Sequence, residues 1–170
     1  VEGGNDMTLP EQERERFCQV LHHSRTSLYR LAFSITRNSS DAQEAVAEAV
    51  CRAYERYPQL REKEKLPRWL LKITANEARR LCQRRGRTVS LDDLPTEPAI
   101  PGRETGDDTL WQAVQTLPQD QREAVVLFYY EDLPTEEIAR IVGTSPGAVR
   151  VRLSRAREKL RSILKEGDYG

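Results

Sequence analysis

A glycine turn between two short amphipathic patterns, at residues 133–164, constrains the fold of this chain more than any other feature. The segment reads LPTEEIARIVGTSPGAVRVRLSRAREKLRSIL. Gly143 follows an apolar helical face, at a position where helices commonly end in the left-handed conformation. Ser145 is a good N-cap, and Pro146 is a good first residue of a new helix. The spacing predicts a helix-turn-helix, a motif that places its second helix in the major groove of duplex DNA.

The second helix of this motif has an apolar face and an arginine-bearing face. At about 100° per residue, the apolar side chains share one stripe that we expect to be buried, made of Val149, Leu153, Ala156, Leu160, Ile163 and Leu164. The opposite face carries Gly147, Val151, Ser154, Arg155 and Glu158, with Arg150 at its edge. Arg152 falls beside the buried stripe, so we expect a structural role for it. An ordinary amphipathic hairpin with solvated arginines is the alternative, but such a hairpin does not require this turn chemistry.

Charge is balanced overall but unevenly distributed along the chain. The 170 residues include 27 basic and 27 acidic ones. One basic block covers residues 68–87 and a second covers 140–165, whereas acidic residues concentrate in 41–64 and 92–137. A protein of this kind can bind DNA through its basic surfaces and a different partner through its acidic ones.

Several classes of site are excluded by what the sequence lacks. Cys18, Cys51 and Cys82 fit no metal-binding spacing and indicate a reducing compartment without disulfides. There is no nucleophile–base pair, no phosphate-cradling glycine loop, no signal peptide and no apolar run long enough to cross a membrane. We therefore expect a cytoplasmic protein that is not an enzyme, with no catalytic residues, metal or cofactor. Met7 resembles a natural start, so residues 1–6 are expected to be a cloning remnant within a disordered stretch, 1–9.

The rest of the chain reads as helices, which predicts an all-α protein. Helical periodicity predicts helices over 10–36, 41–57, 66–85, 108–117, 119–131, 135–142 and 146–165. Ser40 offers an N-cap for the second of these, with Gln43 as its capping-box partner. Residues rich in Pro, Asp, Thr and Gly predict a flexible linker at 87–107. The chain thus divides into two small helical domains, at 10–86 and 108–166.

Two helices of the first domain carry candidate binding faces. The helix at 66–85 presents a row of cationic and amide side chains that suits phosphates and base edges, namely Lys72, Asn76, Arg79 and Gln83, with Arg68 beside it. The helix at 41–57 leaves an acidic face interrupted by small residues, which suits a protein partner and includes Glu44, Ala47, Glu48 and Cys51. Ordinary solvated helix faces remain the alternative for both.

Three segments, taken in order, resemble the extracytoplasmic-function (ECF) group of bacterial RNA polymerase sigma factors. The stretch DAQEAVAEAVCRAYE at 41–55 is similar to the helix with which that family docks on the polymerase. WLLKITANEARRLCQRR at 69–85 resembles its minus-ten helix, and EEIARIVGTSPGAVRVRLSRAREKL at 136–160 resembles its minus-thirty-five signature. The resemblance covers nearly the whole chain from about residue 12 and implies sigma region 2 at 10–86 and region 4 at 108–166.

The resemblance also implies partners and roles. Core RNA polymerase would bind through its β′ clamp helices and β flap, with the clamp helices facing Asp41, Glu44, Ala47, Glu48 and Cys51. The minus-ten strand would contact Arg68, Lys72, Asn76, Arg79 and Gln83. The upstream element would contact Arg150, Val151, Ser154 and Arg155, near Gly147. An anti-sigma factor is a further implied partner.

The sequence departs from the family pattern at two places. Ala47 stands where the family usually has glutamine, and Ala45 and Val50 replace a leucine and a bulky aromatic, which predicts weaker polymerase docking. The loop at 58–65, PQLREKEK, is charged where relatives often carry an aromatic near a flipped-out promoter base. The alternative function is a stand-alone dimeric helix-turn-helix regulator.

Overall fold

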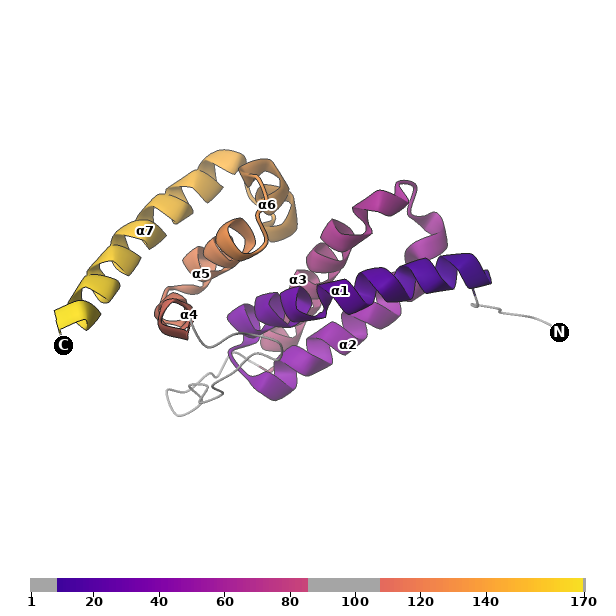
Figure 1. Cartoon of the computed structure of the whole chain (residues 1–170), viewed down its shortest axis with the longest axis horizontal. Coiled ribbons are helices and arrows are strands. Elements are labelled where there is room, and N and C mark those ends of the chain that lie inside the picture. The colour runs from indigo at the N-terminus through magenta and orange to yellow at the C-terminus, as the bar shows by residue number, and fades with distance from the viewer. Residues whose placement is uncertain (1–8, 86–107, 170) are drawn as a thin grey trace.

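The protein is built from two helical units that lie side by side (Figure 1). The computed structural model describes residues 9–85 and 108–169, and every regular element in these ranges is helical. The elements of the first unit are α1 (Glu11–Thr36), α2 (Ser39–Arg56), the short 3-10 turns η1 (Tyr57–Gln59) and η2 (Lys63–Lys65), and α3 (Leu66–Arg84). Those of the second are α4 (Asp108–Gln115), α5 (Gln119–Val125), the π turn η5 (Val126–Tyr130), α6 (Thr135–Val142) and α7 (Pro146–Tyr169). The predicted all-α fold with two domains is confirmed, while the predicted linker at 87–107 lies outside the described residues.

The first unit is a three-helix bundle in which the buried face of α2 is rich in alanine. Four alanines of α2 are buried to 2% exposure or less, which lets α1 and α3 approach the α2 backbone closely: Ala42, Ala45, Ala49 and Ala53. At one end of the bundle, Phe17 packs edge-on against Tyr54 and Tyr57, with ring centroids 5.3 and 5.4 Å apart. The bundle thereby fixes which face of α3 remains outside.

The start of α2 differs from the prediction. The N-cap is Asn38 rather than Ser40, and its side-chain oxygen accepts a hydrogen bond from the Asp41 backbone N–H at 2.9 Å. The sequence offers Asn, Ser and Ser in succession, and all three are good cap residues. The extended backbone of Asn38 decides between them, because it lets the helix begin two residues earlier than expected.

The helix predicted at 119–131 is divided in the structure. It begins as α5 and widens into a π turn at Val126–Tyr130, closed by a hydrogen bond from the Glu131 N–H to the Val126 carbonyl at 3.2 Å. Val126 and Leu127 are both fully buried, and Tyr130 makes an edge contact with Trp111 at 5.4 Å. The aromatic end of this segment thus packs against α4 and has π geometry in place of a regular α-helix.

The helix-turn-helix has the geometry that its sequence predicts. Gly143 has φ = 78°, and Ser145 caps α7 by accepting a hydrogen bond from the Ala148 N–H at 3.1 Å. The predicted apolar stripe of α7 lies inward, with its first four members buried at 9% exposure or less: Val149, Leu153, Ala156 and Leu160. No helix in the described ranges is long and apolar enough to cross a bilayer.

Candidate nucleic-acid interface

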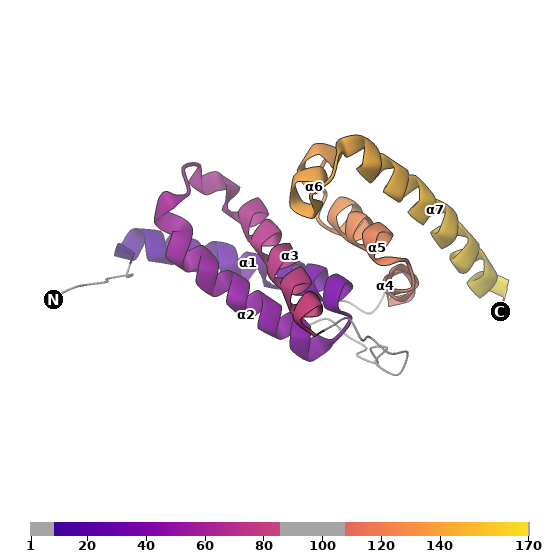
Figure 2. The same ribbon diagram turned by 180° about the vertical axis from the view of Figure 1, so that it is seen from behind.

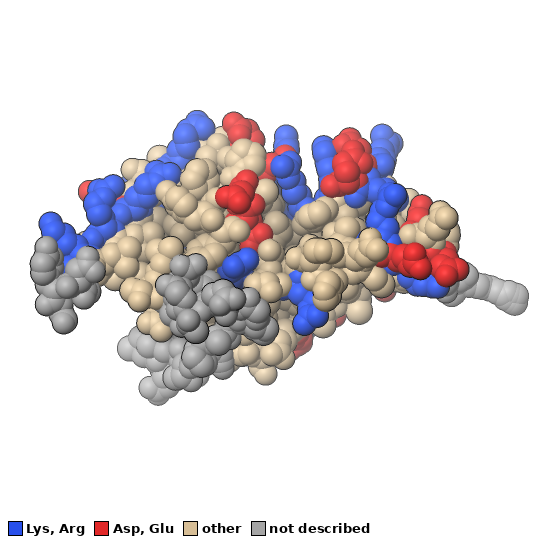
Figure 3. Space-filling view, viewed as in Figure 1, with Lys and Arg blue, Asp and Glu red and all other residues tan. Residues whose placement is uncertain are grey.

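The outer face of α7 is an exposed, cationic surface. Gly147, Arg150, Ser154 and Arg155 are exposed, and Val151 is 48% exposed. Figure 3 shows Lys and Arg side chains following the outer edge of α7. Arg152 turns away from this face and lies 3.8 Å from the Asp120 carboxylate, in keeping with its expected structural role. An apolar side chain among arginines and a serine can contact both phosphates and base edges.

Helix α3, which carries the predicted row, lies on the side of the first unit that faces the second (Figure 2). Lys72, Asn76 and Gln83 are exposed. Arg79 Nη2 instead lies 2.8 Å from the Glu123 carboxylate of α5, and Arg68 Nη1 lies 3.2 Å from Glu137 of α6. Two cations of the row are therefore paired with acids of the other unit.

Arg122 is the centre of the contact between the two units. Its side chain is buried, and its Nε donates to the carbonyl oxygen of Ser34 at 2.5 Å while Nη1 donates to that of Leu117 at 2.6 Å. Burial, together with the nearby positive charge of Arg37, lowers the pKa of Arg122 to about 10. Sequence reasoning missed this residue, although a charged Arg-Glu pair directly before the apolar run at 124–130 is a pattern that could have pointed to it.

A second contact joins α1 to the end of the π turn. Arg30 lies 3.3 Å from the Glu131 carboxylate and stacks over the Tyr130 ring at 5.1 Å. Burial raises the pKa of Glu131, although a hydrogen bond with Ser27 and the charge of Arg30 act in the opposite direction. These contacts and those of Arg122 hold the two units against each other, an arrangement that we call closed.

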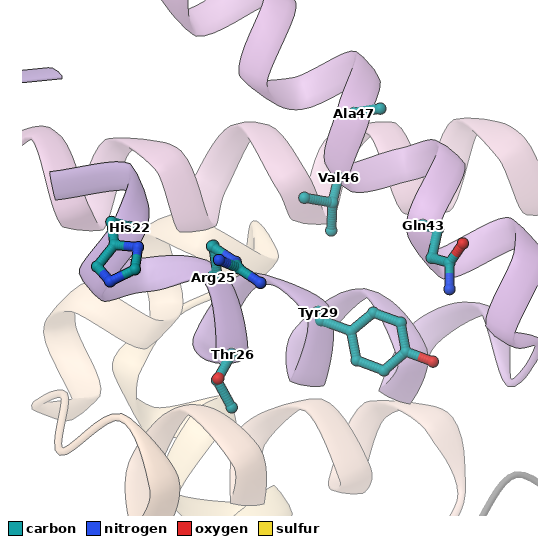
Figure 4. Close-up of a pocket in the computed structure, with 7 residues that line it drawn as sticks. All are labelled: His22, Arg25, Thr26, Tyr29, Gln43, Val46 and Ala47. Atoms are coloured by element: carbon teal, nitrogen blue, oxygen red, sulfur yellow. The ribbon is translucent and has the colours of Figure 1, made fainter. Parts of the chain in front are cut away.

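The predicted protein-binding face of α2 is open. Glu44, Ala47, Glu48 and Cys51 are exposed, whereas Asp41 is only 17% exposed and lies 3.2 Å from Arg85. Next to this face, α1 and α2 enclose a groove of about 540 Å³, lined by His22, Arg25, Thr26, Tyr29, Gln43, Val46 and Ala47. Figure 4 shows Val46 directed toward the α1 side of this groove.

The charged loop at 58–65 is held by one lysine. Lys63 Nζ donates to the carbonyl oxygens of Tyr57 and Leu60 at 2.8 and 2.7 Å, and it lies 4.5 Å from the centre of the Tyr57 ring. Lys63 thus organises this loop. Within the described ranges, no group of three or more His, Cys, Asp or Glu residues could hold a metal ion.

Comparison with known proteins identifies both units. Residues 20–88 match the family described as Sigma-70 region 2, and residues 107–160 match Sigma-70 region 4. The chain is 32% identical to the RNA polymerase sigma factor SigV of Bacillus subtilis strain 168 over 142 residues, which is 82% of this chain and 86% of that protein. It is also 32% identical to the ECF RNA polymerase sigma factor EcfG of Rhodopseudomonas palustris strain TIE-1, over 81% of this chain and 79% of that one.

A solved structure has a similar fold. It is the sigma factor RpoE of Bartonella quintana, crystallised in complex with the anti-sigma factor NepR. The TM-score is 0.72 at 26% identity, and the match covers 92% of this chain and 98% of that one. The two matched regions correspond, in order, to the two helical units. Together with the 32% identity to relatives that are covered over most of their length, they place this chain in the ECF group of RNA polymerase sigma factors.

Proposed function

We propose that this chain binds core RNA polymerase and directs it to promoters through two DNA-binding faces. The observation that carries the proposal is the exposed face of α7, which combines Arg150 and Arg155 with Val151 on a helix that begins at a well-formed turn. This face would enter the major groove of the minus-thirty-five element. The two arginines would supply phosphate affinity and one or two base contacts, while Gly147 and Ser154 allow close approach.

The row on α3 would capture the unpaired minus-ten strand. Lys72, Asn76 and Gln83 are already exposed, but Arg68 and Arg79 would have to exchange Glu137 and Glu123 for DNA. The closed arrangement therefore competes with promoter binding. Separation of the two units would make all five residues of the row available, and the linker would keep the second DNA contact effectively intramolecular.

The acidic face of α2 would dock on the β′ clamp helices, and region 4 would contact the β flap. The small side chain at Ala47 leaves the neighbouring groove open, so a side chain of the polymerase could enter between α1 and α2. The partner of the solved RpoE structure is an anti-sigma factor. Because the fold is shared, we propose an anti-sigma factor as a partner of this chain as well.

The chain would act in the cytoplasm, where transcription takes place, and it would act by binding rather than by catalysis. Its residues would position polymerase and hold the melted strand, with no chemical step of their own.

Run-off transcription with core polymerase tests the proposal. The purified chain, added to core enzyme and a library of genomic promoter fragments, should give discrete transcripts that neither component gives alone. The variant carrying both Arg150→Ala and Arg155→Ala should lose them, and Arg161→Ala, which changes an exposed arginine further along α7, should retain them. A dimer that binds a palindromic site without polymerase, and yields no transcript with it, would instead establish the stand-alone regulator.

A further inference from the structure

A cationic cavity lies between the two units. Its walls come from the end of α1, from α3, from the turn between α4 and α5, and from α7, and its volume is about 700 Å³. Small-molecule sites commonly measure roughly 300–1,000 Å³. Among the described residues that line it there are four cations and no carboxylate, the cations being Arg37, Arg79, Arg122 and Lys159.

Two of these cations already have hydrogen-bond or ion-pair partners. Arg79 lies 2.8 Å from the Glu123 carboxylate, and Arg122 donates to two main-chain carbonyl oxygens. Arg37 and Lys159 make no ion pair with any residue that the structure describes. The lining of the cavity therefore carries an excess of positive charge, contributed by both units.

Arg37 is held in an unusual position. It follows the last residue of α1 with φ = 57°, a conformation that costs an arginine roughly 1–2 kcal/mol. Its Nε atom is buried without a hydrogen-bond partner, and its positive charge is close enough to repel the Arg122 guanidinium. An anion between these two guanidinium groups would relieve both the repulsion and the unmet hydrogen bond.

We propose that this cavity binds a small phosphorylated compound, with Arg37 and Lys159 as its principal cationic contacts. A phosphate group offers several oxygens to the planar fork of an arginine, and the Gln83 amide on the same wall supplies a further hydrogen-bonding group. The cavity volume of about 700 Å³ suits a compound of nucleotide size.

Such a ligand would bind only the closed arrangement and would stabilise it. Opening would separate Arg37 from Lys159, so binding energy is gained only while the two units remain together. The ligand would thereby keep Arg79 paired with Glu123 and away from promoter DNA. This effect on DNA binding rests on the proposed function of α3, whereas ligand binding itself does not.

Isothermal titration calorimetry on the full chain, without polymerase or DNA, tests the site. Inorganic phosphate, pyrophosphate and guanosine diphosphate would be titrated separately at matched ionic strength in chloride. We expect saturable binding of at least one of them. Affinity should fall at least about tenfold, which is about 1.4 kcal/mol, in Arg37→Gly and in Lys159→Gln.

The variants are chosen so that misfolding does not obscure the result. Glycine adopts φ = 57° without strain, so Arg37→Gly keeps the end of α1 while removing the guanidinium. Lys159 is exposed on α7, and Arg161→Gln, two residues further along the same helix, is the matched control. Thermal unfolding without ligand verifies that all three variants fold.

Three results would overturn the proposal. These are no saturable binding of any of the three compounds, an equal loss of affinity in Arg161→Gln, and binding of a single-stranded oligonucleotide at the site in place of the small anions. The relative affinities of phosphate, pyrophosphate and guanosine diphosphate distinguish a free phosphate site from a nucleotide site. Since the assay contains no promoter, its failure would leave the run-off experiment unaffected.

Discussion

Glu131 carries a carboxylate that is only 10% exposed, between α1 and the end of the π turn. Burial is the main reason that its pKa is raised, while Ser27 and Arg30 reduce the shift and Asp132 adds to it. A raised folded-state pKa means that the folded protein binds the proton more tightly than the unfolded chain does. The stability contributed by this proton is complete below the ordinary carboxyl value of 4.5 and is lost as pH rises through the higher folded value.

The substitution Glu131→Gln should therefore change the pH dependence of stability. Glutamine is neutral at every pH, so the variant should gain stability relative to the parent as pH rises from about 4 to about 7. Urea unfolding at several pH values measures the difference, with Glu136→Gln, an exposed glutamate of α6, as the control. A constant difference between parent and variant across this range would show that Glu131 is not titrating as described.

At the scale of single elements, the turn before α7 allows a paired test of backbone strain. Gly143 has φ = 78° and no atom within 4 Å of the place that a Cβ would occupy, so Gly143→Ala should destabilise the chain by about 1 kcal/mol through backbone strain alone. Gly147 lies within α7, and an added Cβ there would meet nothing closer than 4.0 Å. Gly147→Ala should thus stabilise by up to about 0.5 kcal/mol. Chemical denaturation of both variants should give opposite signs, and equal signs would contradict the assigned turn.

The DNA-binding role proposed for the outer face of α7 leads to a second prediction at this scale. Arg150→Ala and Arg155→Ala should each weaken binding to the upstream element by about 1–3 kcal/mol if these side chains read bases. Arg152→Ala should affect stability more than affinity, because Arg152 faces Asp120 and not the open surface. Fluorescence anisotropy with promoter duplexes, compared with thermal unfolding, separates the two effects. Unchanged affinity in both of the first variants would move the recognition surface elsewhere on the helix.

The elements themselves could be predicted from sequence to a large extent, whereas their docking could not. Helical periodicity predicts the buried stripe of α7, and the Gly143 turn follows from glycine's conformational freedom. By contrast, Arg79 and Glu123 are 44 positions apart, and Arg30 and Glu131 are 101 apart. A charged residue on a helix carries no signal of which distant partner it will meet. Even the N-cap of α2 could not be predicted, because three adjacent residues are good caps and only the backbone conformation of Asn38 selects among them.

At the scale of the whole molecule, a small number of polar contacts hold the two units closed. Arg122 bonded to the Ser34 carbonyl and the pairs at Arg79, Arg68 and Arg30 all cross between the units. Surface ion pairs contribute little, but Glu123 is 5% exposed and would be left as a buried charge if Arg79 were removed. Under the proposed function, promoter binding would use Arg79 and Arg68, which closure also uses. Closure and promoter binding should then oppose each other.

Removing the acids that hold these arginines should therefore favour opening. The double variant Glu123→Gln with Glu137→Gln keeps side-chain volume but removes the charges that face Arg79 and Arg68, and should weaken the closed arrangement by about 1–3 kcal/mol. Small-angle X-ray scattering should show a larger radius of gyration, and transcription at limiting concentration of the chain should increase. Glu136→Gln, an exposed position on the same helix as Glu137, should change neither the radius of gyration nor transcription. If the double variant expands without any gain in transcription, the paired arginines do not restrain promoter capture; if it stays compact, the apolar and Arg122 contacts alone maintain closure.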